Sequence, residues 1–279
     1  MTAATVAPGR QVGDGVRVTF PRVVRSEWVR FRSLRSSWVT LAITVLLLVG
    51  LAALSCWARE AHWPPRDPGE AASFNATLQA IGPGTFLAQL AVGVLGVLLV
   101  TGEYATGMVR ATMAAVPRRV PVLLARGLVF ASFMAAVLVP AVFVAFFVGQ
   151  GLLASKNIDT TLHAPNALRV VFGAGLYLVA IGLLGMALGW VLRHTAGAIT
   201  ALFGLLFIVP LIIHFLPAPW PSNVTKWLPG GVGDSAGIAV WTPHPGTTSL
   251  GPWAGFGVLV LWAVVVFAVG AITLRRRDV

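Results

Sequence analysis

The stretch WVTLAITVLLLVGLAALSCW, Trp38 to Trp57, contains no charged side chain. A helix rises about 1.5 Å per residue, and a bilayer core about 30 Å thick needs about 20 apolar residues to cross it. This stretch is therefore long and apolar enough to be a membrane-spanning helix.

The composition of the whole chain is also that of a membrane protein. Of its 279 residues, 57% are hydrophobic and 10% are charged, whereas globular domains carry about a quarter charged residues. The mean hydropathy of +0.85 points the same way. The sequence therefore predicts an all-α integral membrane protein with six transmembrane helices. The predicted spans are Trp38–Trp57, Thr85–Thr101, Gly127–Gly149, Val170–Leu192, Gly197–Phe215 and Trp253–Leu274.

The predicted organisation is a single membrane domain over residues 1–279. Residues 1–37 form a tail and an interface helix, 38–274 the six-helix domain, and 275–279 a second tail. The second span is the shortest, and we expect it to start after Gly82-Pro83-Gly84. Pro140 and Pro210 lie inside spans and predict kinks.

The basic residues predict the orientation. If the N-terminus is cytoplasmic, 15 of the 20 lysine and arginine residues fall on the cytoplasmic side. Cytoplasmic segments of membrane proteins carry this excess. Both termini are therefore expected in the cytoplasm, and the net charge of +11 is explained without a nucleic-acid partner.

The segment before the first span predicts an amphipathic helix. Large apolar residues recur at helical spacing, so they share one helix face. They are Val24, Trp28, Phe31, Leu34 and Trp38. A basic amphipathic helix beside a span is expected to lie in the membrane interface, with the lipid bilayer as its partner. Glu27 lies near the apolar stripe and is expected to pair with Arg30. The alternative is a solvated basic tail.

The hairpin TGEYATGMVRATMAAVPRR, Thr101 to Arg119, is predicted to be cytoplasmic. Gly102 and Pro117 bracket a segment of helical propensity, 103–116. We expect a polar helix here that docks on a soluble protein, with a plain connector as the alternative. No charged residue lies in a predicted span, so proton coupling is poorly supported, while Na⁺ coupling through carbonyl and hydroxyl groups stays open. The energy for any transport is expected from another subunit.

Enzyme and metal chemistry is poorly supported. The five histidines are scattered and the single cysteine, Cys56, excludes a cysteine-based metal site. No phosphate-binding loop is present, so the chain is not expected to hydrolyse ATP. The motif GDSAG, 233–237, resembles a hydrolase nucleophile elbow but lacks its strand context. The surrounding outer loop, with VGDSAGIAVW at 232–241, is expected to hold short re-entrant helices.

Two stretches carry a family resemblance. The N-terminal SEWVRFRSLRSSWVTL and the loop TGEYATGMVRATMAAVPRR, combined with six spans, resemble the permease subunits of ABC-2 type ABC transporters, especially actinobacterial ones. The resemblance covers nearly the whole chain. The stretch KWLPGGVGDSAGIA resembles the family's outer segment before the last span, although Gly230-Gly231 departs from the usual pattern.

The resemblance implies a membrane-embedded export subunit in a bacterial cell membrane. It implies a homo- or heterodimer of permease subunits with two separate ABC ATPase subunits that bind ATP and Mg. A path at the dimer interface lined by apolar and aromatic side chains would suit hydrophobic or amphipathic cargo. It also implies a coupling loop and an interface helix. The coupling-loop residues are Glu103, Tyr104, Gly107, Met108 and Arg110; the interface-helix residues are Trp28, Phe31 and Leu34. A non-transporting membrane scaffold or sensor is the alternative.

Overall fold

The computed structural model describes residues 19–33, 35–108, 119–217, 220–229 and 250–276. These residues form helices and connecting turns, with no β-strand among them. Six of the helical segments are long and apolar enough to cross a membrane, which confirms the predicted number of spans. The six are α2 (Arg35–Ala61), α4 (Ala76–Thr106), α6 (Arg119–Leu153), α7 (Ala167–Leu192), the joined α8 (Thr195–Phe203), η2 (Gly204–Ile208) and α9 (Val209–His214), and α12 (Pro252–Arg276).

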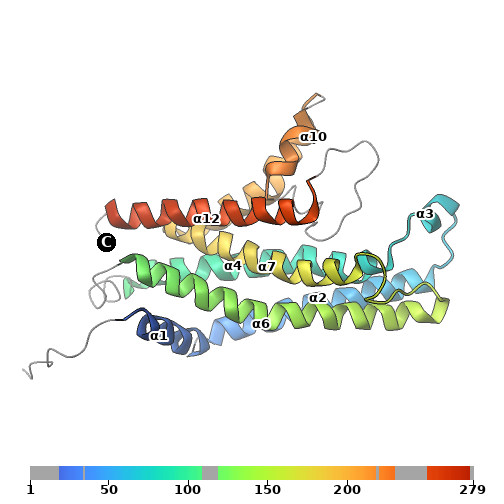
Figure 1. The fold of residues 1–279 in the computed structure, drawn as a ribbon, viewed down its shortest axis with the longest axis horizontal. Coiled ribbons are helices and arrows are strands. Elements are labelled where there is room, and N and C mark those ends of the chain that lie inside the picture. Colours follow the sequence, from blue (N-terminus) through green and yellow to red (C-terminus); the bar gives the residue numbers. More distant parts are fainter. Residues whose placement is uncertain (1–18, 34, 109–118, 218–219, 230–249, 277–279) are drawn as a thin grey trace, which may run out of the picture.

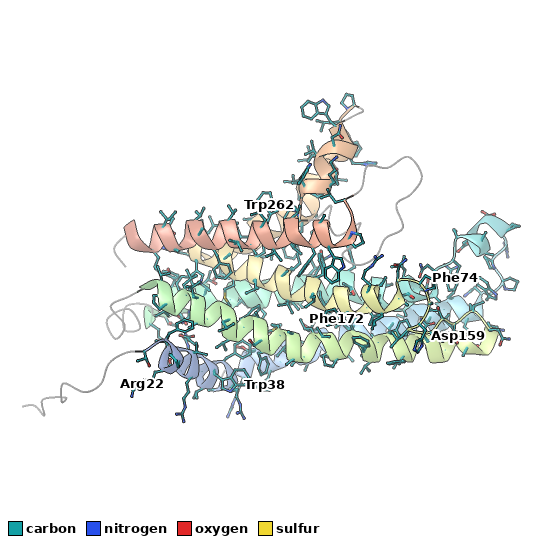
Figure 2. The ribbon with its side chains drawn as sticks, viewed as in Figure 1. Arg22, Trp38, Phe74, Asp159, Phe172 and Trp262 are labelled. Carbon is teal, nitrogen blue, oxygen red and sulfur yellow. The ribbon has the colours of Figure 1, made fainter. Side chains whose placement is uncertain are left out.

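Shorter helices flank or connect the spans. The first, α1 (Phe20–Ser33), precedes α2 and packs beside α6 (Figure 1). The others are α3 (Pro68–Ala72), η1 (Ala154–Lys156), α10 (Trp220–Val224) and η3 (Thr225–Trp227). Trp262 lies on α12 (Figure 2). Its indole N–H donates a hydrogen bond to the carbonyl of Trp227, 2.8 Å away, which links η3 to the last span.

The spans are arranged around α4 and α7. These two helices pack against each other and lie between α2 and α6 on one side and α8 and α12 on the other (Figure 1). Most of α7 is buried, including its fully enclosed Trp190. A Cβ on Gly96 would overlap the carbonyl oxygen of Gly182. The two backbones therefore approach more closely than larger residues would allow, as small residues permit in membrane helix pairs.

The predicted start of the second span was wrong. Helix α4 begins at Ala76, where the Asn75 side chain accepts a hydrogen bond from the Leu78 N–H at 3.1 Å and caps the helix. Pro83 lies inside the helix and has no N–H for the carbonyl of Gln79. The Ser55 hydroxyl of α2 donates to that carbonyl instead, at 2.9 Å. The helix thus continues through the proline, and the second span is longer than expected.

The fifth span contains an irregular segment. The π-helical turn η2 ends at Ile208, immediately before α9, and Pro210 is the second residue of α9. Proline cannot donate to the preceding turn, and π-turns accommodate such breaks in a helix. Between η2 and α10 the chain turns away from the bundle (Figure 1). Pro140, by contrast, lies within the continuous helix α6. The expected re-entrant residues, 232–241, lie outside the described part of the chain.

Candidate functional site

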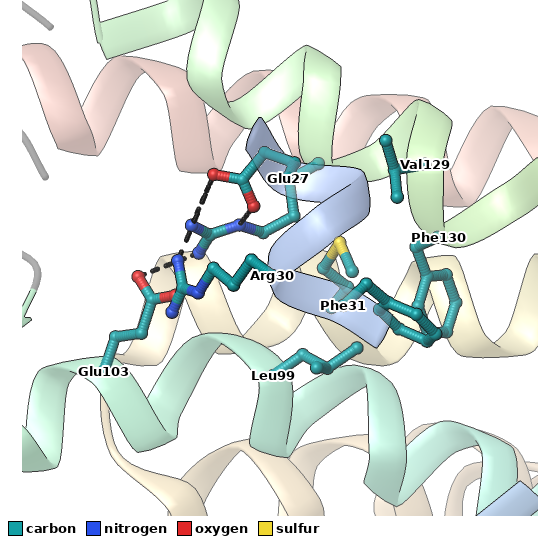
Figure 3. Close-up of a pocket in the computed structure, with 9 residues that line it drawn as sticks. Glu27, Arg30, Phe31, Leu99, Glu103, Val129 and Phe130 are labelled. Atoms are coloured by element: carbon teal, nitrogen blue, oxygen red, sulfur yellow. Dashed lines mark hydrogen bonds and ion pairs between the residues drawn. The ribbon is translucent and has the colours of Figure 1, made fainter. Parts of the chain in front are cut away.

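Four charged residues meet where α1 packs on the ends of two spans. Glu27 and Arg30 come from α1, Glu103 from the last turn of α4, and Arg126 from the second turn of α6 (Figure 3). We call these four residues the charge cluster. Residues widely separated in the sequence are brought together because α1 runs beside the start of α6.

Arg126 is the centre of the charge cluster. Its Nε and Nη2 donate to the two carboxylate oxygens of Glu27 at 3.0 and 3.1 Å, a two-point contact. Its Nη1 lies 2.9 Å from Oε2 of Glu103. Arg30 forms an ion pair with the other oxygen of Glu103, and its Nη1 lies 4.0 Å from Glu27. Two arginines and two carboxylates therefore balance each other.

The charge cluster is largely withdrawn from solvent. Glu27, Glu103 and Arg126 are 8%, 5% and 6% exposed, while Arg30 is partly exposed. Removing one partner of a buried ion pair leaves an uncompensated charge and costs about 3–5 kcal/mol. Burial, and then the nearby Arg126, lower the pKa of the Arg30 guanidinium, whereas Glu27 opposes them. Arginine nevertheless remains charged in proteins.

A small pocket lies beside the charge cluster, under α1. Its apolar lining combines one residue of α1 with residues of the three central helices around it (Figure 3). These are Phe31, Leu99, Val129, Phe130 and Met186. The described residues contain no group of His, Cys, Asp or Glu side chains suited to a metal ion. The four charges neutralise one another by direct contact, so this arrangement joins α1, α4 and α6.

Cations and aromatic rings extend the network away from α1. The Arg126 guanidinium lies over the ring of Trp190, 5.3 Å from its centroid. Trp190 contacts Tyr104 edge-on at 6.0 Å, and Arg193 lies over Tyr104 at 5.4 Å. Arg193 also donates to the carbonyl of Thr273 near the end of α12, at 3.2 Å. Cation–ring contacts of this kind are worth about 0.5–2 kcal/mol each. The α1 end of the bundle is thus connected from α1 to α12.

The predicted coupling residues fall into two environments. Glu103 and Tyr104 belong to α4, which runs through Gly102 and ends at Thr106, so they are not on a separate polar helix as expected. Gly107 follows as the C-cap with φ +70°, a conformation that suits glycine, and Met108 beyond it is 53% exposed. Arg110 and the remainder of the predicted helix, 109–116, lie outside the described residues.

The predicted face of α1 is rotated in the structure. Phe31 is buried and contacts Phe130 and Phe133, as its place in the stripe suggests. Trp28, however, is 39% exposed, and the buried positions beside Phe31 are Val23 and Glu27. Glu27 is turned inward because its partner Arg126 comes from α6. Leu34 lies outside the described residues.

Sequence reasoning missed two features of the site. The sequence gives no role to Arg126 beyond its share in the basic excess, and the family resemblance places Glu103 in a coupling loop, whereas in the structure both belong to the charge cluster. The one available signal was the position of Glu27 near an apolar stripe, which calls for a buried cationic partner. Nothing in the sequence identifies that partner across 99 residues.

Comparison of the sequence with protein-family models and with curated proteins finds no match. The role of the charge cluster therefore rests on its own geometry and on the stretches that resemble a transporter family.

Proposed function

We propose that this protein is the membrane-spanning permease subunit of an ATP-driven ABC transporter of the ABC-2 type. A separate ATPase subunit binds ATP and Mg and supplies the energy. In this proposal the chain lies in a bacterial cell membrane with both termini in the cytoplasm. Helix α1 is the cytoplasmic interface helix, and the segment between α4 and α6 docks on the ATPase.

The observation that carries the proposal is the charge cluster. It fixes α1 to the last turn of α4 and to the second turn of α6. These are the two helices that flank the proposed docking segment. Buried ion pairs restrain the geometry of the groups that they join. Movement of the docking segment by an ATPase would therefore be transmitted to α1 and both spans together.

The exposed end of α4 supports the docking role. Gly107 turns the chain out of the helix and Met108 presents an exposed side chain directly before the proposed docking residues. Glu103 itself is buried, so its part in coupling is to hold α4 against α1 and α6. Direct contact with the ATPase is then left to residues after Thr106.

A second permease copy and apolar cargo complete the proposal. The fifth and sixth spans are the least buried of the six within one chain. Their outward residues include Ile208, Leu211 and Val264, all exposed. Such surfaces suit lipid or a second permease copy. A path between apolar spans suits hydrophobic or amphipathic molecules, and export is the direction we propose for them.

Photo-crosslinking from Met108 tests the proposal. A photoreactive amino acid at Met108, in membranes of the source organism, should capture a protein that carries a phosphate-binding loop. The same group at Lys156 is the matched control, because Lys156 is also exposed but lies in η1 after α6, at the opposite end of the bundle from Met108. Capture should be specific to Met108.

The outcome also separates the two candidate functions. An ATPase crosslinked from Met108 whose hydrolysis rises on adding the purified permease supports the transporter. A non-transporting scaffold or sensor would capture no ATPase from this position. Equal capture from Met108 and Lys156 would count against docking at the α4–α6 end.

A further inference from the structure

Helix α1 has a second face that the charge cluster does not use. Arg25, Trp28, Val29 and Arg32 recur at three- and four-residue spacing, so they share one side of the helix, and all are exposed. Arg35, three residues beyond Arg32 in the sequence, is the first residue of α2 and is also exposed. The helix contains one acidic residue, Glu27, and it is buried on the opposite side. The outward face of α1 is therefore basic and partly apolar.

This face lies on the flank of the bundle. Helix α1 packs lengthwise beside α6, so its outward face points sideways from the bundle and not off its end (Figure 1). The rings of Trp28 and Trp38 contact Phe133 at 5.8 and 5.2 Å. Phe133 is seven residues beyond Arg126 along α6, which is about 10 Å closer to the middle of the span.

The depth of α1 follows from these contacts. Its C-terminal end adjoins the start of α2, and Phe31 of α1 and Trp38 of α2 contact the same ring, that of Phe133. If α2 crosses the membrane, this level is where headgroups give way to hydrocarbon. Trp38 is 47% exposed there and lies on the α1 side of the bundle (Figure 2). Tryptophan is enriched at this level of membranes, and arginine extends its charged end from it into the headgroup layer.

We propose that the outward face of α1 binds the phosphate groups of anionic phospholipids. Arg25, Arg32 and Arg35 supply the charge, and the planar guanidinium matches phosphate with two parallel hydrogen bonds. Within the described part of the chain, no ion pair is recorded for these three arginines. Exposed Trp28 and Trp38 anchor the same surface in the interfacial layer.

The position of this face favours lipid over an acidic protein surface. A soluble partner reaches the end of the bundle, whereas the surroundings of a flank at this depth are lipid headgroups. The proposal deepens the membrane-interface role assigned to α1 and rests on that part of the proposed function. It does not require an ATPase.

Competitive lipid binding to the purified full-length protein is the test. The detergent-solubilised protein is mixed with equal amounts of phosphatidylglycerol and phosphatidylcholine that carry identical acyl chains. Native mass spectrometry then gives the ratio of the two bound lipids. A basic residue near an anionic surface contributes about 1 kcal/mol, or roughly fivefold in binding. We expect the variant R25Q/R32Q/R35Q to lose at least tenfold of the preference for phosphatidylglycerol.

Two further variants control for charge and fold. R66Q/K156Q removes two exposed basic residues outside α1 and should keep the preference. R25K/R32K/R35K keeps the charge and should retain most of it. If the glutamine variant does not fold, the preference of the wild-type protein should still weaken as salt is raised, because screening reduces attraction between exposed charges.

Equal binding of both lipids by the wild-type protein would overturn the proposal. So would a preference that survives in R25Q/R32Q/R35Q, or one that R66Q/K156Q loses equally. If R25Q/R32Q/R35Q instead abolished capture of an ATPase while the wild-type protein showed no lipid preference, the face would be a protein-docking surface. Because the lipid measurement contains no ATPase, its failure is distinct from failure of the transporter proposal.

Discussion

Charged side chains at the charge cluster are tolerated because each carboxylate faces two guanidinium groups. Glu103 lies against Arg30 and Arg126, and Glu27 accepts both bonds of the Arg126 fork. Desolvating two ions costs several kcal/mol each, and only close pairing repays it. The charge cluster thus holds α1, α4 and α6 together, and its contribution to the stability of the fold depends on all four residues.

Glu103→Ala tests how much the charge cluster stabilises the fold. The substitution leaves Arg30 and Arg126 to share Glu27, so we expect the free energy of unfolding in detergent to fall by about 3–5 kcal/mol. Glu70→Ala is the matched control, because Glu70 pairs with Arg59 at an exposed site, where such pairs contribute about 0–1 kcal/mol. Thermal unfolding of the purified variants gives both values.

A double-mutant cycle shows whether the loss belongs to the ion pair. Arg126→Ala should cost clearly less when Glu103 is already alanine, since contacting residues in one network are coupled by about 0.5–3 kcal/mol. Additive losses of unfolding free energy in the cycle would contradict a stabilising role for the charge cluster. So would similar losses for Glu103→Ala and Glu70→Ala.

At the scale of the helices, the apolar runs predicted which segments span, whereas hydrogen bonds at capping residues and between helices determine where a helix such as α4 begins. Twenty-residue runs without charge leave few structures other than a spanning helix, so six spans could be foreseen. The start of α4 could not be predicted, because Gly-Pro-Gly ordinarily ends a helix. Helix α4 continues through this stretch because the Ser55 hydroxyl of α2 donates a hydrogen bond to the carbonyl of Gln79, which Pro83 cannot bond. That compensation is a tertiary contact which the sequence does not display.

Gly84 and Gly96 are explained by helix contacts. A Cβ on Gly84 would lie 2.8 Å from the carbonyl oxygen of Leu48 in α2, and a Cβ on Gly96 would overlap Gly182 of α7. In the sequence, Gly84 resembles part of a turn, although in the structure it lets α2 and α4 approach closely.

The charge cluster could be predicted only as separate residues, because the sequence does not show which helices are neighbours.

Gly96→Ala should separate α4 from α7. The added methyl group meets backbone, which cannot move aside as a side chain can, so we expect a loss of about 1–3 kcal/mol or more in unfolding free energy. Gly50→Ala makes the same change on an open surface of α2, with nothing within 4 Å of the new Cβ. It should cause no loss. Equal stability of the two variants in denaturant unfolding would rule out close α4–α7 packing.

At the scale of the whole molecule, the polar contacts gather toward the two ends of the bundle. One end holds the charge cluster with Tyr104 and Arg193, and the other holds the Arg59–Glu70 pair. Between these ends, the Tyr177 hydroxyl of α7 donates a hydrogen bond to the side-chain oxygen of Gln89 in α4. A band of apolar surface bounded by polar ends is what a bilayer requires of a multi-pass protein.

The last prediction concerns the side of the membrane that each end of the bundle faces. Six spans, an even number, would put both termini on one side of the membrane, and the excess of arginine at the α1 end predicts that this side is the cytoplasm. In a Cys56→Ser background, a cysteine at Lys156 should react with a membrane-impermeant thiol reagent in intact cells. A cysteine at Met108 should react only after the cells are opened. Both positions are exposed, so a difference in labelling reports the side of the membrane and not burial. Labelling of the Met108 position in intact cells, with the Lys156 position protected, would invert the bundle and remove the α4–α6 segment from the reach of any cytoplasmic ATPase.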